Sequence, residues 1–370
     1  MKQFRPTILI ALVSALGFII LETLIQVRVL DDYTLQILCI AGINVLVALS
    51  LNLISGFTGQ LALGHAGFMA VGAYTTGILL VQAHWPLLPA LLGGGLMTAL
   101  FGMLIGMPTL RLRGDYLAIV TLGFGEIIRV AINNFDEILR WVVGKPDMAG
   151  WTGGPTGLSG IPGYDVNIMV NNPAAFLWIY PAVTLAVLLV MNLIRSSHGR
   201  ALIAVREDEI SAQAMGVNLF GMKLTSFTIS AFLAGLGGAL YAPFIGYLSP
   251  PGFDFLRSVF FVIIVVLGGM GSITGTVIAG IGLTFLQEFL RTNAKDAGNG
   301  LIKLVQQSIF PGTLSSGAWT VDLVPLSQVL FGLILILLMI FRPGGLMGTR
   351  ELPLTRLLST PWWRKKAAHP

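Results

Sequence analysis

Two ionisable residues inside an apolar stretch are the first candidates for chemistry. Glu126 and Arg129 stand three residues apart between residues 115 and 135, a range that has the hydropathy of a membrane span. Residues three apart share one face of a helix, so their side chains are expected to meet. An unpaired charge at mid-membrane would cost about 2.5–3.5 kcal/mol on insertion scales. The spacing therefore predicts a structural ion pair, with gating or solute contact as the alternative.

His65 and a glycine-rich run are further candidates for a solute path. His65 shares a predicted helix with Ala62, Ala66 and Ala70, whose four-residue spacing is typical of closely packed membrane helices. We expect it to be a hydrogen-bonded packing residue, with a path residue as the alternative. The run 268–275 fails the G-x-G-x-x-G pattern of dinucleotide loops and predicts a tight turn or a broken helix. Broken helices can line a cavity, which makes path candidates of Gly268, Gly269 and Gly271.

Motifs of catalysis and of metal binding are missing from the sequence. It contains no G-x-x-x-x-G-K-[ST] phosphate loop, no H-E-x-x-H and no G-x-S-x-G. Its single cysteine, Cys39, cannot form an internal disulfide. We therefore expect a chain that is not an enzyme, holds no metal or cofactor, and does not hydrolyse ATP on its own.

Residues 199–217 lie in the longest predicted cytoplasmic loop and carry a dense charge cluster. Asp208 is a suitable N-cap and Gly216 a suitable C-terminal stop, which predicts a short helix from about 209 to 215. A solvated loop is one interpretation, and docking of a partner protein is the other. The docking interpretation rests on Gly199, Arg200, Arg206, Glu207, Asp208, Glu209, Ala212, Met215 and Gly216.

The composition identifies the elements that must position these residues. Of 370 residues, 55% are hydrophobic and only 11% are charged, and the mean hydropathy is +0.84. Soluble domains carry about 25% charged residues, so a soluble surface is excluded. The 45 glycines are typical of membrane helices that pack closely. We predict an all-α polytopic membrane protein with about ten spans, at 6–26, 34–55, 61–83, 87–108, 115–135, 173–194, 224–246, 257–270, 272–290 and 325–341.

The distribution of positive charge predicts the orientation of these spans. With both ends inside, 14 of the 22 Lys and Arg residues lie in cytoplasmic segments and 7 in outside segments, as the positive-inside rule requires. A cleaved signal peptide is the alternative for the first span, but no clear cleavage site follows it. The prediction divides the chain into a transmembrane domain 1–348, with an outside loop 136–172, and a cytoplasmic tail 349–370.

Stretches throughout the chain resemble the permease subunits of bacterial branched-chain amino acid ABC importers. They follow the family order from about residue 36 to 348, at 59–68, 110–126, 152–162, 199–216, 265–272 and 341–345. The resemblance implies a type II importer permease in which spans two to five and seven to ten form inverted repeats. Residues 308–321 look like an insertion relative to shorter members.

The resemblance also implies partners and a place of action. These are a second permease, two cytoplasmic ATPases that bind ATP, and a periplasmic amino-acid-binding protein at the bacterial inner membrane. Residues 199–217 would then be the ATPase-coupling segment, with Ala212 and Met215 filling a pocket of the ATPase. Leucine, isoleucine and valine are the implied solutes. A related urea or amide importer and a self-contained secondary transporter remain as alternatives.

Overall fold

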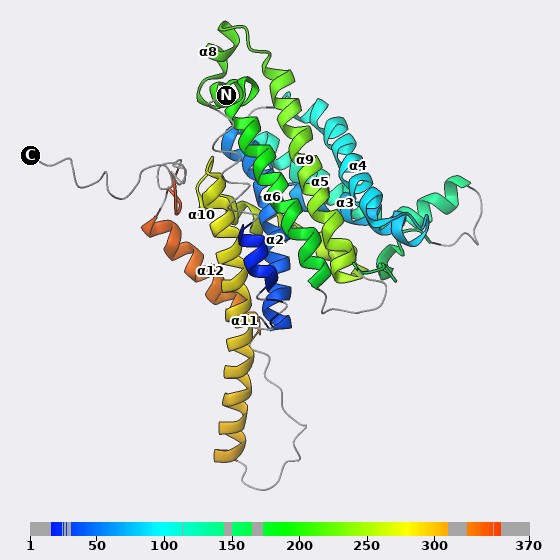
Figure 1. Ribbon diagram of the computed structural model, residues 1–370, viewed down its shortest axis with the longest axis vertical. Helices are drawn as coiled ribbons and strands as arrows, with labels where there is room; N and C mark the ends of the chain where they lie inside the picture. The colour runs from blue at the N-terminus through cyan, green and yellow to red at the C-terminus, as the bar shows by residue number, and fades with distance from the viewer. Residues whose placement is uncertain are drawn as a thin grey trace, which may run out of the picture.

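The computed structural model describes residues 16–23, 25, 27, 31–112, 114–143, 150–164, 173–309, 324–342 and 344–348. These residues form a helical bundle with one pair of two-residue strands, β1 (Leu158–Ser159) and β2 (Tyr247–Leu248) (Figure 1). The helices are α2 Asp32–Asn52, α3 His65–Val81, α4 Leu87–Thr109, α5 Asp115–Val143, α6 Pro173–Arg195, α7 Ser197–Glu207, α8 Glu209–Ala214, α9 Leu219–Ile245, α10 Phe255–Gly268, α11 Ile273–Ile309 and α12 Val324–Phe341. A π-helix, η1 (Leu53–Phe57), continues α2, and 3-10 turns form η2 (Gly154–Thr156) and η3 (Pro250–Phe253).

Seven helices in the described part of the chain are long and apolar enough to cross a membrane. Two shorter apolar helices, α3 and the Ser327–Phe341 part of α12, fall below that length. The predicted first span, 6–26, lies largely outside the described residues, although residues 16–23 are helical. The prediction of an all-α polytopic membrane protein is confirmed, but the predicted number of ten spans is not exact. The predicted tail 349–370 lies outside the described residues.

Several helix boundaries differ from the prediction. Helix α5 runs on to Val143 and α11 to Ile309, because both continue through polar turns beyond the apolar part that marks a span. Helix α3 begins at His65, not at 61, because residues 58–64 form no regular structure. Figure 1 shows α11 extending past the other helices.

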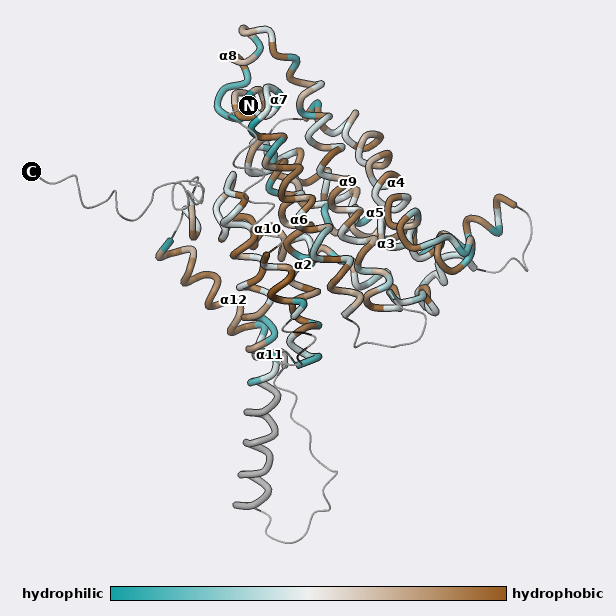
Figure 2. The backbone as a smooth tube through the Cα atoms, viewed as in Figure 1, coloured by the Kyte–Doolittle hydropathy of each residue, from teal (hydrophilic) through white to brown (hydrophobic). Residues whose placement is uncertain are grey.

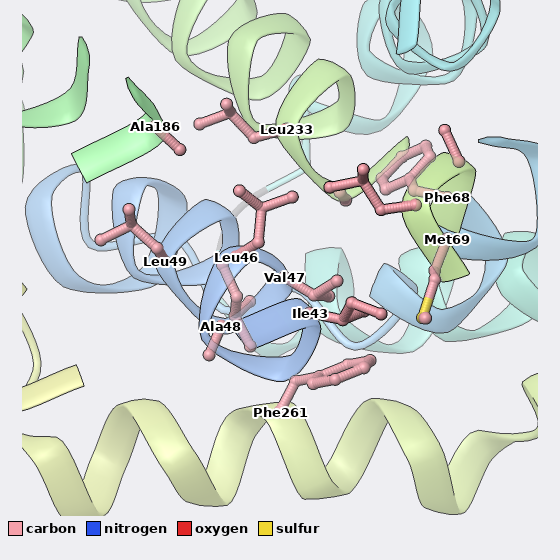
Figure 3. Packing of buried hydrophobic residues seen from close by; sticks show 14 of the residues in the cluster. Ile43, Leu46, Val47, Ala48, Leu49, Phe68, Met69, Ala186, Leu233 and Phe261 are labelled. Atoms are coloured by element: carbon pink, nitrogen blue, oxygen red, sulfur yellow. The ribbon is translucent and has the colours of Figure 1, made fainter. Parts of the chain in front are cut away.

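Helix α2 lies at the centre of the bundle. Some 78% of its membrane window is buried, and its apolar residues are not confined to one face, as expected for a helix surrounded by others. Figure 3 shows Ile43, Leu46 and Val47 of α2 among Phe68 of α3 and Phe261 of α10. Each of these five side chains is at most 3% exposed. The core is thus built around α2.

Glycines let α3 and α9 approach each other closely. A Cβ on Gly72 of α3 would lie 2.0 Å from the Gly235 carbonyl oxygen, and one on Gly238 of α9 would lie 1.9 Å from the Met69 carbonyl oxygen. Because neither position has room for a side chain, the two backbones are in direct contact.

The two halves of the bundle pack reciprocally. Helices α3 and α4 pack on α9, α10 and α11 pack on α2, and α2 packs on α9. A two-fold relation that exchanges α2–α5 with α9–α12 requires this pattern, so the contacts agree with the implied inverted repeats. At one end of the bundle, η1, which continues α2, contacts α7. Strand β2 follows the C-terminal end of α9, at the opposite end of that helix from α8.

Candidate functional site

Helices α7 and α8, here called the α7–α8 elbow, cover one end of the bundle. Figure 2 shows hydrophilic residues gathered at this end, whereas the helices below are largely hydrophobic. Ser196 caps α7 by accepting a hydrogen bond from the Gly199 amide (3.2 Å). A Cβ on Gly199 would lie 2.2 Å from the Leu193 carbonyl oxygen, so the α6–α7 turn requires glycine there.

The predicted helix 209–215 is present as α8, but α7 was not predicted. The sequence feature that could have predicted α7 is a capping serine, Ser196, followed by two apolar residues three apart, Leu202 and Val205. In the structure each of these two residues is 2% exposed. Leu202 and Val205 attach α7 to the bundle. The helix was not predicted because the charges around residue 207 are also typical of a solvated loop.

Asp208 separates the two helices and caps the second. Its Oδ1 accepts hydrogen bonds from the amides of Ile210 (2.8 Å) and Ser211 (3.1 Å), and its Oδ2 accepts one from the Ser211 hydroxyl (2.9 Å). The bonds from Ser211, with the one from Ile210, hold the pKa of the Asp208 carboxyl below its usual value. Gly216, at a φ of 84°, follows α8 as the predicted stop.

The charged cluster of the elbow does not point in one direction. Glu209 forms an ion pair with Lys223 of α9 (2.6 Å). Arg206 turns towards the bundle, and Arg200 donates to the Arg195 carbonyl oxygen (3.2 Å). Glu207 lies 3.9 Å from the Arg206 Nε, and its side chain is 71% exposed, so it is the more outward-facing member of that ion pair.

The apolar residues of α8 require a correction. Ala212 is 4% exposed and packs within this chain, so it is not free to fill a pocket of another protein. Met215 is 85% exposed and Ile210 is 82% exposed. The exposed apolar pair of the elbow is therefore Ile210 and Met215, because the short helix turns Ala212 inward.

Arg206 brings together the two glycine-rich connections that the sequence keeps more than 200 residues apart. Its Nη1 donates to the Gly56 carbonyl oxygen of η1 (2.6 Å). A Cβ on Gly59 would lie 3.0 Å from the Arg206 Cγ, and one on Gly271 would lie 2.9 Å from its Nη1. Both glycines have positive φ, 73° and 88°. We call this group of Arg206, Gly56, Gly59 and Gly271 the Arg206 junction.

Asn52, fully buried at the end of α2, ties the junction to the α10–α11 turn. Its Oδ1 accepts from the Gly271 amide (2.9 Å), and its Nδ2 donates to the Ser272 carbonyl oxygen (3.0 Å) and the Thr276 hydroxyl (2.8 Å). Both ends of the buried amide are satisfied, so η1 and the α10–α11 turn are held as one unit.

Gly268 and Gly269 form the tight turn that was predicted at this position. A Cβ on Gly268 would lie 2.6 Å from the Gly275 carbonyl oxygen, and one on Gly269 would lie 2.3 Å from that of Gly348. The segment 344–348 docks here, with the Leu346 amide donating to the Leu267 carbonyl oxygen (2.7 Å). Both glycines thus serve backbone packing in this chain.

His65 is completely buried at the start of α3. Its Nε2 lies 3.1 Å from the Ser230 hydroxyl, which donates to the Ser50 carbonyl oxygen (2.6 Å). Its ring meets Phe68 edge to face. This environment agrees with the packing interpretation of His65.

Glu126 and Arg129 form the predicted ion pair on α5. The Arg129 Nε donates to the Glu126 Oε2 at 2.7 Å, and the side chains are 32% exposed for Arg129 and 36% for Glu126. The pair lies on α5, which contributes no residue to the Arg206 junction. Within the described residues no cluster of three His, Cys, Asp or Glu side chains is placed to hold a metal ion.

Comparison with known proteins places the chain in a family. Residues 33–339 match the family described as branched-chain amino acid transport system / permease component. The high-affinity branched-chain amino acid transport system permease protein LivM of Escherichia coli is 36% identical, over 87% of this chain and 71% of that protein. The chain belongs to this permease family. Probable LivM of Methanocaldococcus jannaschii is 23% identical (90% and 97% covered), and E. coli LivH is 24% identical (72% and 89%). No solved structure matches the chain.

Two buried polar contacts near the elbow were not predicted from the sequence. Asn52 and Lys223 were not singled out, although both are buried polar residues that bind the elements around the α7–α8 elbow. The available signal was an asparagine and a lysine within or beside apolar spans, where polar side chains need partners.

Proposed function

We propose that this permease is the membrane-spanning subunit of an ATP-driven importer of branched-chain amino acids. It would pair with a second, related permease and with two cytoplasmic ATPases, and a periplasmic binding protein would deliver leucine, isoleucine or valine. The names of its relatives, LivM and LivH, support both the solute class and a paired permease. The permease would lie in the bacterial inner membrane with both termini in the cytoplasm.

The Arg206 junction is the observation that carries this proposal. The α7–α8 elbow protrudes from the bundle, and its Arg206 binds the connection after α2, which Asn52 joins to the turn before α11. A push on the elbow would therefore act on helices of both halves of the bundle. Such a contact would let a movement of the ATPases reach the membrane helices.

The exposed face of the elbow supplies the docking surface for an ATPase. Ile210 and Met215 present apolar area, and Glu207 presents a negative charge beside them. The matching surface would be an apolar groove with a basic rim. ATP would be bound and hydrolysed by the partner subunits, with no cofactor held by the permease.

Reconstitution of the assembled complex in proteoliposomes tests the proposal. We expect ATP-dependent uptake of labelled leucine delivered by the binding protein, and much less uptake of alanine or urea. Uptake of urea in preference to leucine would assign the complex to another solute. Uptake by the permease alone, driven by an ion gradient, would contradict the importer assignment.

A charge reversal tests the docking surface. Glu207→Arg should weaken ATPase assembly, because it places a positive charge against the basic rim, while Asp31→Arg, at an exposed position just before α2, should leave assembly unchanged. Pull-down of the ATPases with the tagged permease measures assembly. Equal recovery from both variants would remove Glu207 from the docking surface.

A further inference from the structure

Helix α8 is too short to fix its own orientation. Its six residues make fewer than two turns, and it lies between Asp208, which has an extended backbone, and Gly216, which has a φ of 84°. At the elbow end of the bundle, α8 packs on α7 and on α9 (Figure 1). A contact with one of these helices must therefore set which residues of α8 face outward.

Glu209 and Ala212 are residues of α8 that face the bundle. They are three apart and share one side of the helix. Ala212 is 4% exposed, and the Glu209 Oε1 accepts a hydrogen bond from the Lys223 Nζ of α9 (2.6 Å). Ile210 lies about 100° from Glu209 around the helix axis and is exposed. The Glu209–Lys223 pair thus fixes the rotation of α8 that turns Ile210 outward.

Lys223 is the buried member of this ion pair. Its side chain is 10% exposed, whereas that of Glu209 is 39% exposed. Taking an ammonium group out of water is unfavourable unless a carboxylate pairs with it. Separating the pair would leave the lysine charge buried without that carboxylate. Lys223 therefore holds Glu209, and with it α8, more firmly than an exposed lysine would.

Apolar packing beneath the elbow is incomplete. A cavity of about 140 Å³ lies between α6, α7 and α9, where Leu202, Met222 and Ser226 contribute to its lining. Protein interiors leave few spaces larger than a water molecule. Because apolar contacts do not fill this space, the polar contacts of Arg206 and Glu209 carry more of the attachment. Arg206 binds η1 after α2 and Glu209 binds α9, so the elbow is attached to both halves of the bundle.

We propose that Lys223 is a positioning residue for the ATPase. Through Glu209 it holds α8 in the orientation that presents Ile210 and Met215, and it carries a movement of α8 to α9. This inference rests on the proposed function and adds the contact that orients the docking surface. Without the pair, α8 could turn on its axis. Binding of the ATPase should then weaken although no residue of the docking surface has changed.

An exchange of the two charges tests the proposal. Glu209→Lys sets an ammonium group against Lys223, and Lys223→Glu sets a carboxylate against Glu209. We expect each single variant to lower recovery of the ATPases with the tagged permease about tenfold, and the double variant to restore most of it by re-forming the pair in reverse. Arg291→Met is the control, because it breaks an ion pair of the same length, 2.6 Å to Glu288, on α11. Its recovery should equal that of the parent.

A second set of variants separates positioning from folding. Lys223→Met removes the buried charge and leaves a carboxylate that is partly exposed, so its melting temperature should stay close to that of the parent while ATPase recovery falls. Lys223→Arg keeps the charge and should restore recovery. Full recovery with Lys223→Met would overturn the proposal, and so would a double exchange that recovers no more than the single variants. Failure of the parent permease to bind the ATPases would instead contradict the proposed function.

Discussion

The Arg206 junction and the polar residues of α5 from Glu126 to Glu137 both place polar groups in an apolar bundle, but the two regions differ in how those groups are satisfied. At the junction, Arg206 and Asn52 bind backbone atoms of other segments, and glycines clear the space around them. On α5, Glu126 and Arg129 bind each other, and the side chains of Asn133 and Glu137 make no hydrogen bond to the described residues. The polar groups of the junction are thus satisfied within the chain, whereas the side chains of Asn133 and Glu137 are left to water or to another molecule.

Filling the junction should produce the largest effect. A Cβ on Gly56 would lie 1.8 Å from the Asn52 Oδ1 and 2.4 Å from the Gly271 amide nitrogen, so Gly56→Ala forces η1 and the α10–α11 turn apart. We expect a loss of about 3 kcal/mol in stability, at the upper end for overpacking. Gly282→Ala is the control, because nothing lies within 4 Å of a Cβ there. Thermal melting of the purified permease compares them, and equal melting temperatures would show that the junction is not tightly packed.

Removing the Arg206 donor at the junction should uncouple solute uptake from ATP hydrolysis. Arg206→Met leaves the Gly56 carbonyl oxygen without its donor, which costs about 1–3 kcal/mol when a buried acceptor is left unsatisfied. We expect leucine uptake per ATP hydrolysed to fall, while Arg111→Met, at an exposed arginine outside the elbow, changes little. Uptake and ATP hydrolysis measured on the same proteoliposomes give this ratio. An unchanged ratio in Arg206→Met would mean that the junction does not transmit work.

Breaking the ion pair on α5 should have a smaller effect on stability. Arg129→Met leaves the Glu126 carboxylate unpaired in the membrane, and adding Glu126→Gln should recover much of the loss. Because both side chains are about one-third exposed, we expect a coupling energy of only about 1 kcal/mol in a double-mutant cycle. Additive losses of unfolding free energy in chemical denaturation would show that the two groups do not interact. The α5 pair would then differ from the junction even more.

The smallest effect is expected at the cap of α8. Because the folded-state pKa of Asp208 lies below its unfolded value, its contribution is complete above the unfolded pKa and is lost as the pH falls through the folded one. Asp208→Ala should speed hydrogen exchange at the amides of Ile210 and Ser211 at neutral pH. The difference from the parent chain should shrink in acid. A constant difference at every pH would mean that the carboxylate charge does not support the cap.

Hydropathy predicted the apolar helices because burial in a membrane depends on local composition. Spans such as 87–108 agree with α4 (Leu87–Thr109) to one residue. The three-residue spacing of Glu126 and Arg129 likewise predicted their ion pair, since both partners lie on one helix. The partners of Asn52 lie about 220 residues away, so no local pattern could reveal them. Helix α7 was missed because its attachment to the bundle depends on only two buried side chains.

The docking of residues 344–348 on α10 has a consequence for biosynthesis. The last carbonyl oxygens of α10, those of Leu267 and Gly268, accept hydrogen bonds from the amides of Leu346 and Met347. At a translation rate of about 5–20 residues per second, the ribosome needs about 4 to 16 s to produce the residues between the two partners. During that interval the end of α10 has only water or lipid headgroups to satisfy it. The nascent permease therefore completes this corner of its bundle only after α12 has left the ribosome.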